Sequence, residues 1–284
     1  MPVLFTPMKE LLLDAQRNHY AVPGFNAFNM ESLQAMIEVA SDEQAPIIVM
    51  AEQRDLLYAG LDYIYYLMKA AQGGTKLPAA LHLDHGNDLE IIAKAIEIGF
   101  SSVMIDGSQL PYAENIKVTA SVVEKARAKG VTVEAELGHV GGGGAEGSGA
   151  SLLTDPAVVA EFVETTGVDA LAVAIGTAHG VYTETPKLDF PRLKAIAQET
   201  DVPLVLHGGS GAPDDDLRQA IELGVCKINV GTDIRRAFVS TIVEVGQDST
   251  LDVREVLTPA KNKMKEVIRE RIRVFGASHR LKGD

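Results

Sequence analysis

The feature that most constrains the fold is a regular alternation of short apolar segments and longer amphipathic ones along all 284 residues. Eight segments have the length and β-branched content of buried strands. The stretches between them carry apolar residues at helical spacing, as at Leu33, Met36, Ile37 and Ala40. The predicted strands are residues 20–26, 46–51, 79–85, 102–106, 132–138, 170–176, 203–209 and 227–232.

Eight β/α units in a chain of this length predict an α/β fold of the (β/α)₈ TIM barrel type, which typically takes about 250 residues. Several helical segments end in a glycine able to adopt the left-handed conformation that closes a helix. A doubly wound open sheet is the alternative, but it usually has fewer strands and needs a nucleotide fingerprint after the first, which "PGFNAFN" is not. We therefore expect residues 1–284 to form a single barrel domain. The closing glycines are Gly99, Gly130, Gly167 and Gly224.

Extra helices are expected at both ends of the barrel. At the N-terminus, Thr6 is predicted to cap a short amphipathic helix that Pro7 opens. After the last strand, "TDIRRAFVSTIVEV" and "PAKNKMKEVIRERIRVFG" are predicted helices joined by a polar linker at residues 246–258.

Composition excludes several functional classes. No apolar run approaches the ~18 residues of a membrane span, and the first residues lack the basic region of a secretory signal, so we expect a cytoplasmic protein with no membrane partner. The one cysteine, Cys226, permits no internal disulfide. A net charge of −13 disfavours a nucleic-acid partner, because binding a polyanion depends on lysine and arginine. A small anionic substrate is compatible with this negative net charge if backbone N–H groups bind it.

Three histidines stand where predicted strands end. His85 and His207 stand at the ends of the third and seventh strands and His179 lies just past the sixth, and each is followed by glycine. In a barrel all these positions open on one face, so the three imidazoles are expected to converge as a zinc-type catalytic site with an open coordination position. For any one histidine alone, a satisfied polar residue at a strand end is the better interpretation. The shared position of all three favours the metal site.

The motif "HLDH" adds a carboxylate to this site. Strand alternation puts His82 and Asp84 on one face, with Asp84 directed into the barrel mouth. A carboxylate beside a metal ion stays ionised and can exchange protons with a bound substrate, as a general acid/base does. The alternative role for Asp84 is to orient His85. His82 is expected inside the barrel, whereas solvated side chains are expected for His19, His139 and His279.

Two glycine-rich turns indicate an anion site. The seventh and eighth strands end in "HGGSG" and "NVGTD", and the loops after these strands are the recurrent phosphate site of barrel enzymes. Their backbone N–H groups and hydroxyls can bind an anion without a cation. The predicted cradle consists of Gly208, Gly209, Ser210, Asn229, Val230, Gly231 and Thr232.

A third glycine-rich segment, "GHVGGGGAEGSGAS", follows the fifth strand. A composition this rich in glycine most often indicates a flexible loop with no further role. At the active face it can instead act as a lid that brings its acid, Glu146, over a substrate and excludes water.

With these motifs assembled, the chain resembles the class II, metal-dependent ketose-bisphosphate aldolases, which act on fructose-1,6- and tagatose-1,6-bisphosphate. The likeness runs over nearly the whole length, and "AVAIGTAHG" is somewhat closer to the tagatose type. The segments that carry it are "PGFNAFN", "HLDHG", "SVMIDGS", "VEAELGHVGG", "GVDALAVAIGTAHGVY", "PLVLHGGSG" and "KINVGTD".

The resemblance implies reversible cleavage of a ketose 1,6-bisphosphate to dihydroxyacetone phosphate and glyceraldehyde 3-phosphate through a zinc-stabilised enediolate. It implies that His85, His179 and His207 hold Zn²⁺ and that Asp84 exchanges the proton of the C4 oxygen. A loop carboxylate would handle the proton of the enediolate carbon, and a monovalent cation, Na⁺ or K⁺, would lie near the bound phosphate. The implied ligands of dihydroxyacetone phosphate are Gly180, Gly208, Gly209, Ser210, Asn229, Val230, Gly231 and Thr232.

The same resemblance places Asn26 close to the substrate and makes Asp106 and Glu136 carboxylates of a second metal position. It also implies a homodimer or homotetramer, in which Arg280 would reach the second phosphate of the neighbouring subunit's substrate. One segment departs from the family pattern: the lid lacks the usual adjacent acidic pair and offers only Glu146 as its acid.

Three rival functions are compatible with a barrel. A Schiff-base aldolase would need a lysine inside it, but residues 170–176 contain none and Lys227 is expected at the inactive end of the last strand. A zinc-dependent hydrolase usually begins with a histidine pair on the first strand, where this chain has "YAVPGFN". A sugar-phosphate binding barrel without turnover would keep the cradle alone.

Overall fold

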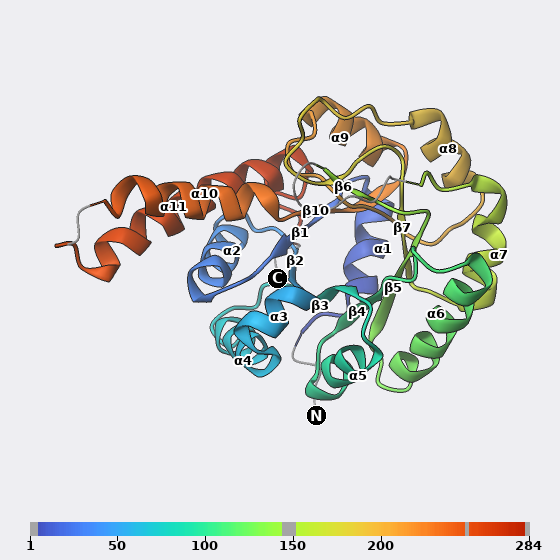
Figure 1. Ribbon diagram of the computed structural model, residues 1–284, viewed down its shortest axis with the longest axis horizontal. Helices are drawn as coiled ribbons and strands as arrows, with labels where there is room; N and C mark the ends of the chain where they lie inside the picture. The colour runs from blue at the N-terminus through green and yellow to red at the C-terminus, as the bar shows by residue number, and fades with distance from the viewer. Residues whose placement is uncertain (1–4, 144–151, 248–249, 282–284) are drawn as a thin grey trace.

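The computed structural model describes residues 5–143, 152–247 and 250–281, and eight parallel strands in it close into a barrel (Figure 1). The strand order around the barrel is β1-β10-β9-β7-β5-β4-β3-β2. Each strand pairs with its neighbour in parallel, as a (β/α)₈ barrel requires. The barrel strands are β1 (Val22–Asn26), β2 (Ile47–Glu52), β3 (Ala79–Gly86), β4 (Ser102–Ile105), β5 (Thr132–Leu137), β7 (Ala170–Val173), β9 (Leu204–Leu206) and β10 (Val225–Val230).

All eight predicted strands are confirmed. In a parallel barrel both faces of the sheet are covered, so each strand is a continuous run of buried apolar residues, and such runs can be recognised in the sequence. Two strands end three residues earlier than predicted. β7 ends at Val173 and β9 at Leu206, where the chain leaves the sheet before its glycines. The described residues also contain a small sheet above the barrel, formed by β6 (Gly142–Gly143) and β8 (His179–Gly180).

Helices surround the barrel in the order that the alternation predicts. Gly99 and Gly167 adopt the left-handed conformation at the ends of α5 (Leu89–Ile98) and α7 (Val159–Thr166), and Gly130 and Gly224 also have positive φ. The helices that follow the strands are α2 (Met30–Asp42), α3 (Gln53–Ala59), α4 (Leu61–Gln72), α5 (Leu89–Ile98), α6 (Tyr112–Arg127), η2 (Pro156–Val158), α7 (Val159–Thr166), α8 (Phe190–Gln198), α9 (Asp214–Glu222) and α10 (Thr232–Val245). No described helix is both long and apolar enough to span a membrane.

The N-terminal helix α1 (Met8–Asn18) closes the end of the barrel where the strands begin. The N–H groups of Thr6 and Lys9 donate to the first residues of β3 and β5, at Ala79 O and Thr132 Oγ1. The predicted cap was wrong: the residue before the helix is Pro7, and no side chain caps it. Thr6 instead uses its backbone to attach α1 to the sheet.

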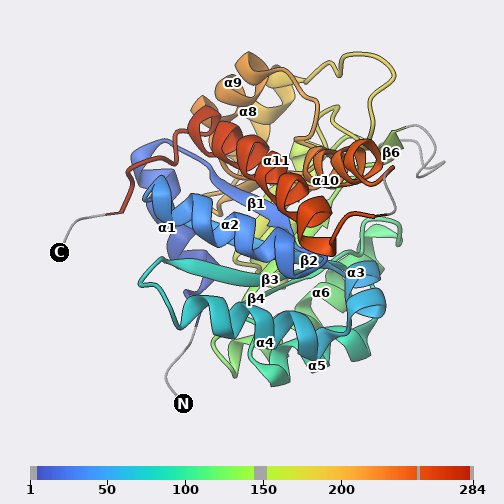
Figure 2. The same cartoon turned by 90° about the vertical axis from the view of Figure 1, so that its left-hand side faces the viewer.

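The two C-terminal helices pack against each other and extend to one side of the barrel (Figures 1 and 2). The second, α11 (Val253–Val274), begins six residues before the predicted start at Pro259, which lies inside the helix. Asp252 and Glu255 form a capping box, which starts the helix within the segment predicted to be a linker.

A buried carboxylate, Glu43, attaches α11 and the segment after it to α2. Its oxygens accept hydrogen bonds from Arg273 (2.7 and 3.1 Å) and from the hydroxyl of Ser278 (2.7 Å). These bonds, led by the one to Arg273, hold the pKa of Glu43 below its usual value despite burial.

We expect Glu43→Gln to lower the free energy of unfolding by about 2 kcal/mol at neutral pH, since hydrogen bonds to a charged group are lost. Because the folded pKa is lowered, the stabilisation is complete above the unfolded pKa of about 4.3 and disappears as pH falls through the folded value. Urea unfolding at pH 7 and pH 3.5 measures both effects. Glu97→Gln is the control, because its pair with Lys129 is exposed and should contribute under about 0.5 kcal/mol.

Candidate active site

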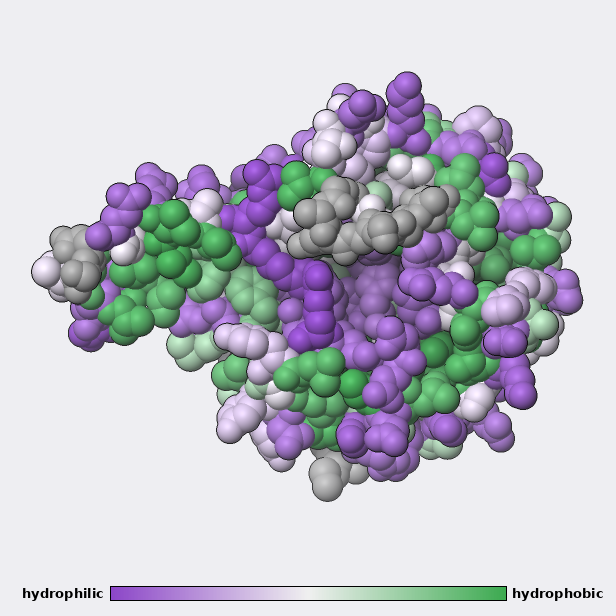
Figure 3. All heavy atoms as spheres, viewed as in Figure 1, coloured by the Kyte–Doolittle hydropathy of each residue, from purple (hydrophilic) through white to green (hydrophobic). Residues whose placement is uncertain are grey.

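A pocket opens at the end of the barrel where the strands finish, and hydrophilic side chains gather at the centre of this face (Figure 3). It is lined by residues from the ends of β1, β2, β3, β10 and from the loops after β4, β5, β7 and β9. The opposite end is covered by α1. The pocket therefore lies on the face where barrel enzymes carry their chemistry.

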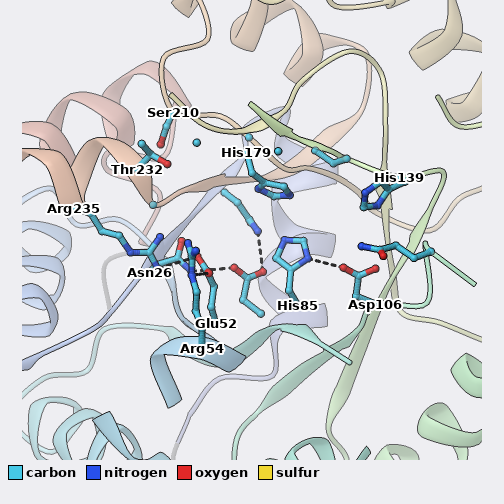
Figure 4. A pocket seen from close by; sticks show the side chains of 18 residues that line it. Asn26, Glu52, Arg54, His85, Asp106, His139, His179, Ser210, Thr232 and Arg235 are labelled. Atoms are coloured by element: carbon cyan, nitrogen blue, oxygen red, sulfur yellow. Dashed lines mark hydrogen bonds and ion pairs between the residues drawn. The ribbon is translucent and has the colours of Figure 1, made fainter. Parts of the chain in front are cut away.

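The three predicted histidines converge in this pocket (Figure 4). One ring nitrogen from each of His85, His179 and His207 lies within 4.8 Å of the others. Nε2 of His85 and Nδ1 of His207 are 2.9 Å apart. Nε2 of His179 is buried and has no hydrogen-bond partner among the described residues. A buried polar atom without a partner is costly, so this arrangement fits a bound cation.

The remaining ring nitrogens of two histidines are held by carboxylates. Nδ1 of His85 donates to Asp106 (2.9 Å), and Nε2 of His207 donates to Glu134 (2.9 Å). The other oxygen of Glu134 accepts from the buried ammonium of Lys227 at 2.8 Å. Carboxylates on the outer nitrogen fix the ring orientation and tautomer of histidines that bind metals, and both histidines here have such a partner.

His85 reaches the pocket because β3 is irregular at its end. The pairing of β3 with β4 shifts register between Leu83 and Gly86, and His85 has φ of 47°, in the left-handed region that non-glycine residues rarely adopt. The shift interrupts the strand alternation, so Asp84 and His85 both line the pocket although they are adjacent. His82, two residues before Asp84, is fully buried in the barrel, as predicted, and its Nδ1 forms a hydrogen bond with Ser102.

The charges around the histidines differ from ring to ring. Burial lowers the pKa of His85, but the carboxylates of Asp84, Asp106 and Glu136 outweigh it and raise the value to about 10. For His179, burial and the neighbouring imidazoles together hold the pKa well below its usual value. His179 is therefore neutral at pH 7, whereas His85 carries a proton that a cation would have to displace.

Asp84 lies beside the histidines with 2% of its surface exposed. Its two oxygens accept hydrogen bonds from the side-chain amides of Asn26 (3.0 Å) and Asn229 (3.2 Å). Burial alone would raise its pKa, but the neighbouring positive charges of His85 and Lys227 lower it, so the carboxylate is ionised.

A second group of ligand atoms shares His85. Its nitrogen and oxygens of Asp106 and Glu136 also lie within 4.8 Å of one another, and Oε2 of Glu136 is buried without a hydrogen-bond partner among the described residues. His139, expected in solvent, lies beside this group. Its Nδ1 is 2.9 Å from Ser108 Oγ and 3.7 Å from Glu136. The solvent prediction for His139 was wrong because the chain after β5 folds back over the pocket rather than outward.

The predicted anion cradle lies on the side of the pocket where β9 and β10 end. Thr232 begins α10, so the positive end of that helix faces the pocket. Gly208 has φ of 70°, and an added Cβ would clash with the carbonyl of Ala178, so only glycine lets the backbone come this close. The cradle residues that line the pocket are Gly180, Gly208, Ser210, Asn229, Gly231 and Thr232.

Two cradle residues have other positions. The N–H of Gly209 donates to the carbonyl of Asn229 (2.9 Å), and the side chain of Val230 is buried in the core. Glu146 lies outside the described residues. Arg280 is outside the pocket, where its guanidinium lies 4.9 Å from the ring centre of Tyr20 and donates to Gly276 O. Its role in a neighbouring subunit stays a prediction.

Several residues of the site were not among the predicted site residues. Of these, Glu134 had the clearest signal in the sequence. It stands two residues before Glu136 in a buried strand, so the two carboxylates share one face. Lys227 is not at an inactive end: it is the third residue of β10, fully buried and paired with Glu134. Glu52 and Arg235 also line the pocket, and no motif marked them.

Comparison with known proteins places this site in a family. The sequence model described as fructose-bisphosphate aldolase class-II matches residues 6–280. The chain belongs to the class II fructose-bisphosphate aldolase family. The resemblance inferred from the motifs is thereby confirmed over nearly the whole length.

Solved structures agree with this assignment to the class II aldolase family. The chain is similar to the YdjI aldolase from Escherichia coli K12, at 33% identity with a TM-score of 0.88, over 98% of this chain and 100% of that one. A proposed fructose-1,6-biphosphate aldolase from Coccidioides immitis has 29% identity and a TM-score of 0.90, over 96% and 97% of the two chains. The fructose-bisphosphate aldolase of Campylobacter jejuni shares the fold at 22% identity, with a TM-score of 0.81 over 95% and 94%.

Proposed function

We propose that this family member catalyses the reversible aldol cleavage of ketose 1-phosphates to dihydroxyacetone phosphate and an aldehyde. For fructose- or tagatose-1,6-bisphosphate the aldehyde would be glyceraldehyde 3-phosphate. The observation that carries the proposal is the convergence of His85, His179 and His207 on one point, beside the ionised carboxylate of Asp84. A retro-aldol reaction needs these two functions, one to stabilise negative charge on a carbonyl and one to accept a hydroxyl proton.

His85, His179 and His207 would hold Zn²⁺, whose preferred ligands include three neutral imidazoles. When bound there, the ion would supply Lewis-acid polarisation of the ketone and its adjacent hydroxyl. The protein's own contribution is to keep the rings oriented, through Asp106 on His85 and Glu134 on His207. We further propose that Asp106 and Glu136 offer a second metal position that shares His85.

Asp84 is the proposed proton acceptor for the C4 hydroxyl in cleavage and the donor in condensation. Asn26 and Asn229 fix the direction of its carboxylate, and burial excludes competing water. Asn229 also has a buried Oδ1 without a partner among the described residues, which suits a hydroxyl of the substrate. Glu146 remains the proposed acid for the proton on the enediolate carbon.

The phosphate of the dihydroxyacetone half is proposed to bind between Gly208, Ser210, Gly231 and Thr232, with a Na⁺ or K⁺ ion near it. The support is the start of α10 and the glycines that bring the backbone close. Binding by dipoles agrees with a chain whose net charge is −13.

Rival functions are less well supported. The Schiff-base alternative needs a free amine in the pocket, whereas the Lys227 ammonium is buried against Glu134 beneath it. A zinc-dependent hydrolase would not require a cradle for a phosphate beside the histidines. A binding barrel without turnover is distinguished only by assay, because it would keep the same pocket.

A coupled assay of triose phosphate release tests the function. We expect cleavage of fructose- or tagatose-1,6-bisphosphate, or of their 1-phosphates, with turnover lost after chelation and restored by Zn²⁺. Running the substrates in parallel determines the preferred C4 epimer. Saturable binding without triose release would contradict catalysis and support the binding barrel, and turnover that survives complete metal removal would contradict the metal role.

We propose that residues 1–284 act as one catalytic domain in a cytoplasmic homodimer or homotetramer. The projecting pair α10 and α11 carries exposed apolar side chains at Val239, Val243 and Val253, which are 57–63% exposed (Figure 3). An apolar face of this kind suits contact with another copy of the chain.

A further inference from the structure

Four charged side chains form a closed cluster at the edge of the pocket. Arg235 donates from Nη2 to Glu52 (2.9 Å) and to Asp55 (2.7 Å), and Arg54 donates from Nε to the other oxygen of Glu52 (2.5 Å). The two guanidinium groups and the two carboxylates cancel in charge. Glu52, Arg54 and Arg235 line the pocket, while Asp55 lies behind Arg235.

The cluster lies next to the proposed proton acceptor. Glu52 at the end of β2 is the register partner of Asp84 on β3, so both side chains face the barrel mouth. Figure 4 shows Glu52, Arg54 and Arg235 around Asn26, on the other side of His85 from Asp106. Asn26 donates to the carboxylate of Asp84, which would meet the C4 hydroxyl. The side chain of Asn26 therefore separates the cluster from this carboxylate.

The direction of a bound sugar follows from these positions. Its C1 phosphate would lie at the cradle of Ser210 and Thr232, its carbonyl at the histidines and its C4 hydroxyl at Asp84. The carbons after C4, which form the aldehyde product, then extend toward Glu52 and Arg235.

This end of the pocket is unsuited to a dianion. A phosphate that approaches either guanidinium also approaches Glu52, because that carboxylate stands between Arg54 and Arg235. Among the described residues, no lysine and no arginine other than these two lines the pocket. Neutral hydroxyls meet no such repulsion, since each can donate to Glu52 and accept from an arginine.

We propose that Glu52 and Asp55, by neutralising Arg235, make the enzyme selective for an aldehyde that carries hydroxyl groups and no phosphate. The preferred substrate is then a ketose 1-phosphate rather than a 1,6-bisphosphate. This inference rests on the proposed aldol cleavage and narrows its substrate class. It assigns to the cluster a role in specificity, separate from the chemistry at Asp84.

The test compares fructose 1-phosphate with fructose-1,6-bisphosphate, and the two tagatose counterparts, on the zinc-loaded enzyme. The expected kcat/KM for the monophosphate equals or exceeds that for the bisphosphate of the same epimer. A preference for the bisphosphate of tenfold or more would overturn the inference and indicate a cation from elsewhere, such as a neighbouring subunit.

Asp55→Asn provides the matched variant, because it frees part of Arg235 without changing a side chain that lines the pocket. We expect the bisphosphate-to-monophosphate ratio of kcat/KM to rise by about tenfold, mainly through KM, as one opposing charge is removed near the guanidinium. Glu38→Gln removes a carboxylate from a pair with Lys261 and Lys265 outside the pocket and should leave the ratio unchanged. An unchanged ratio in Asp55→Asn would contradict the role of the cluster.

Direct titration of the same ketose phosphates separates this inference from the proposed function. If no substrate is cleaved, aldol catalysis is wrong, but the dissociation constants still report on the cluster. Binding of the bisphosphate more than tenfold tighter than the monophosphate would overturn the inference even then, and equal or weaker binding would support it.

Discussion

His207→Ala should release zinc from the protein and lower turnover at least about a thousandfold. His207 is one of three converging ligands, and its loss also leaves Glu134 and Lys227 without their contact to the pocket. Removing a direct ligand weakens metal binding more than removing one of the groups that orient it, which typically costs about 10–100-fold. The measurements are metal content after dialysis, by atomic absorption, and kcat in the coupled cleavage assay.

The control for this variant is His19→Ala. His19 is exposed at the end of α1, on the far side of the barrel from the pocket, so metal content and kcat should stay at their normal values. Near-normal zinc and turnover in His207→Ala would remove this histidine from the site. A circular dichroism spectrum that matches the unsubstituted protein ensures that the loss reflects the ligand and not the fold.

Asp84→Asn should keep the metal but lower the rate of carbon–carbon bond cleavage by about a thousandfold, since a general base typically contributes 10²–10⁴-fold. Asparagine preserves the size of the side chain, and its oxygen can still accept from Asn26 or Asn229. It cannot take the C4 proton. The rate of cleavage and the metal content of the variant are measured together.

Exchange of the dihydroxyacetone phosphate proton with deuterated water gives Asp84→Asn a second measurement. This half-reaction does not involve C4, so it should continue at a rate within about tenfold of normal, since only the group at C4 is changed. If cleavage is unaffected, Asp84 is not the proton acceptor. If exchange and cleavage fall together, Asp84 acts by orienting His85, which was the alternative interpretation of the motif.

The strands and the histidines were predictable because each depends on local sequence. Buried strands leave apolar runs, and residues at strand ends share one face in a parallel barrel, so His85, His179 and His207 could be assigned to the same end of the barrel. The register shift after Leu83, which turns both Asp84 and His85 inward, had no signal in the residues.

The ion pairs around the histidines were not predictable, because their two partners come from distant segments. Lys227 and Glu134 are 93 residues apart, and Arg235 and Glu52 are 183 apart. A lysine inside an apolar strand has no assignable role until the facing strand supplies a carboxylate. The start of α11 was missed for a different reason, since Pro259 outweighed the capping box before it.

The placement of α1 has a consequence for how this protein can diverge. Because α1 attaches to the beginnings of β3 and β5, the parts that secure the closed sheet lie at the end away from the imidazoles. Residues after the strands can then be exchanged for new acceptor preferences while the scaffold keeps its cohesion. Residues that set specificity and residues that stabilise the barrel therefore lie at opposite ends of the molecule and can change independently.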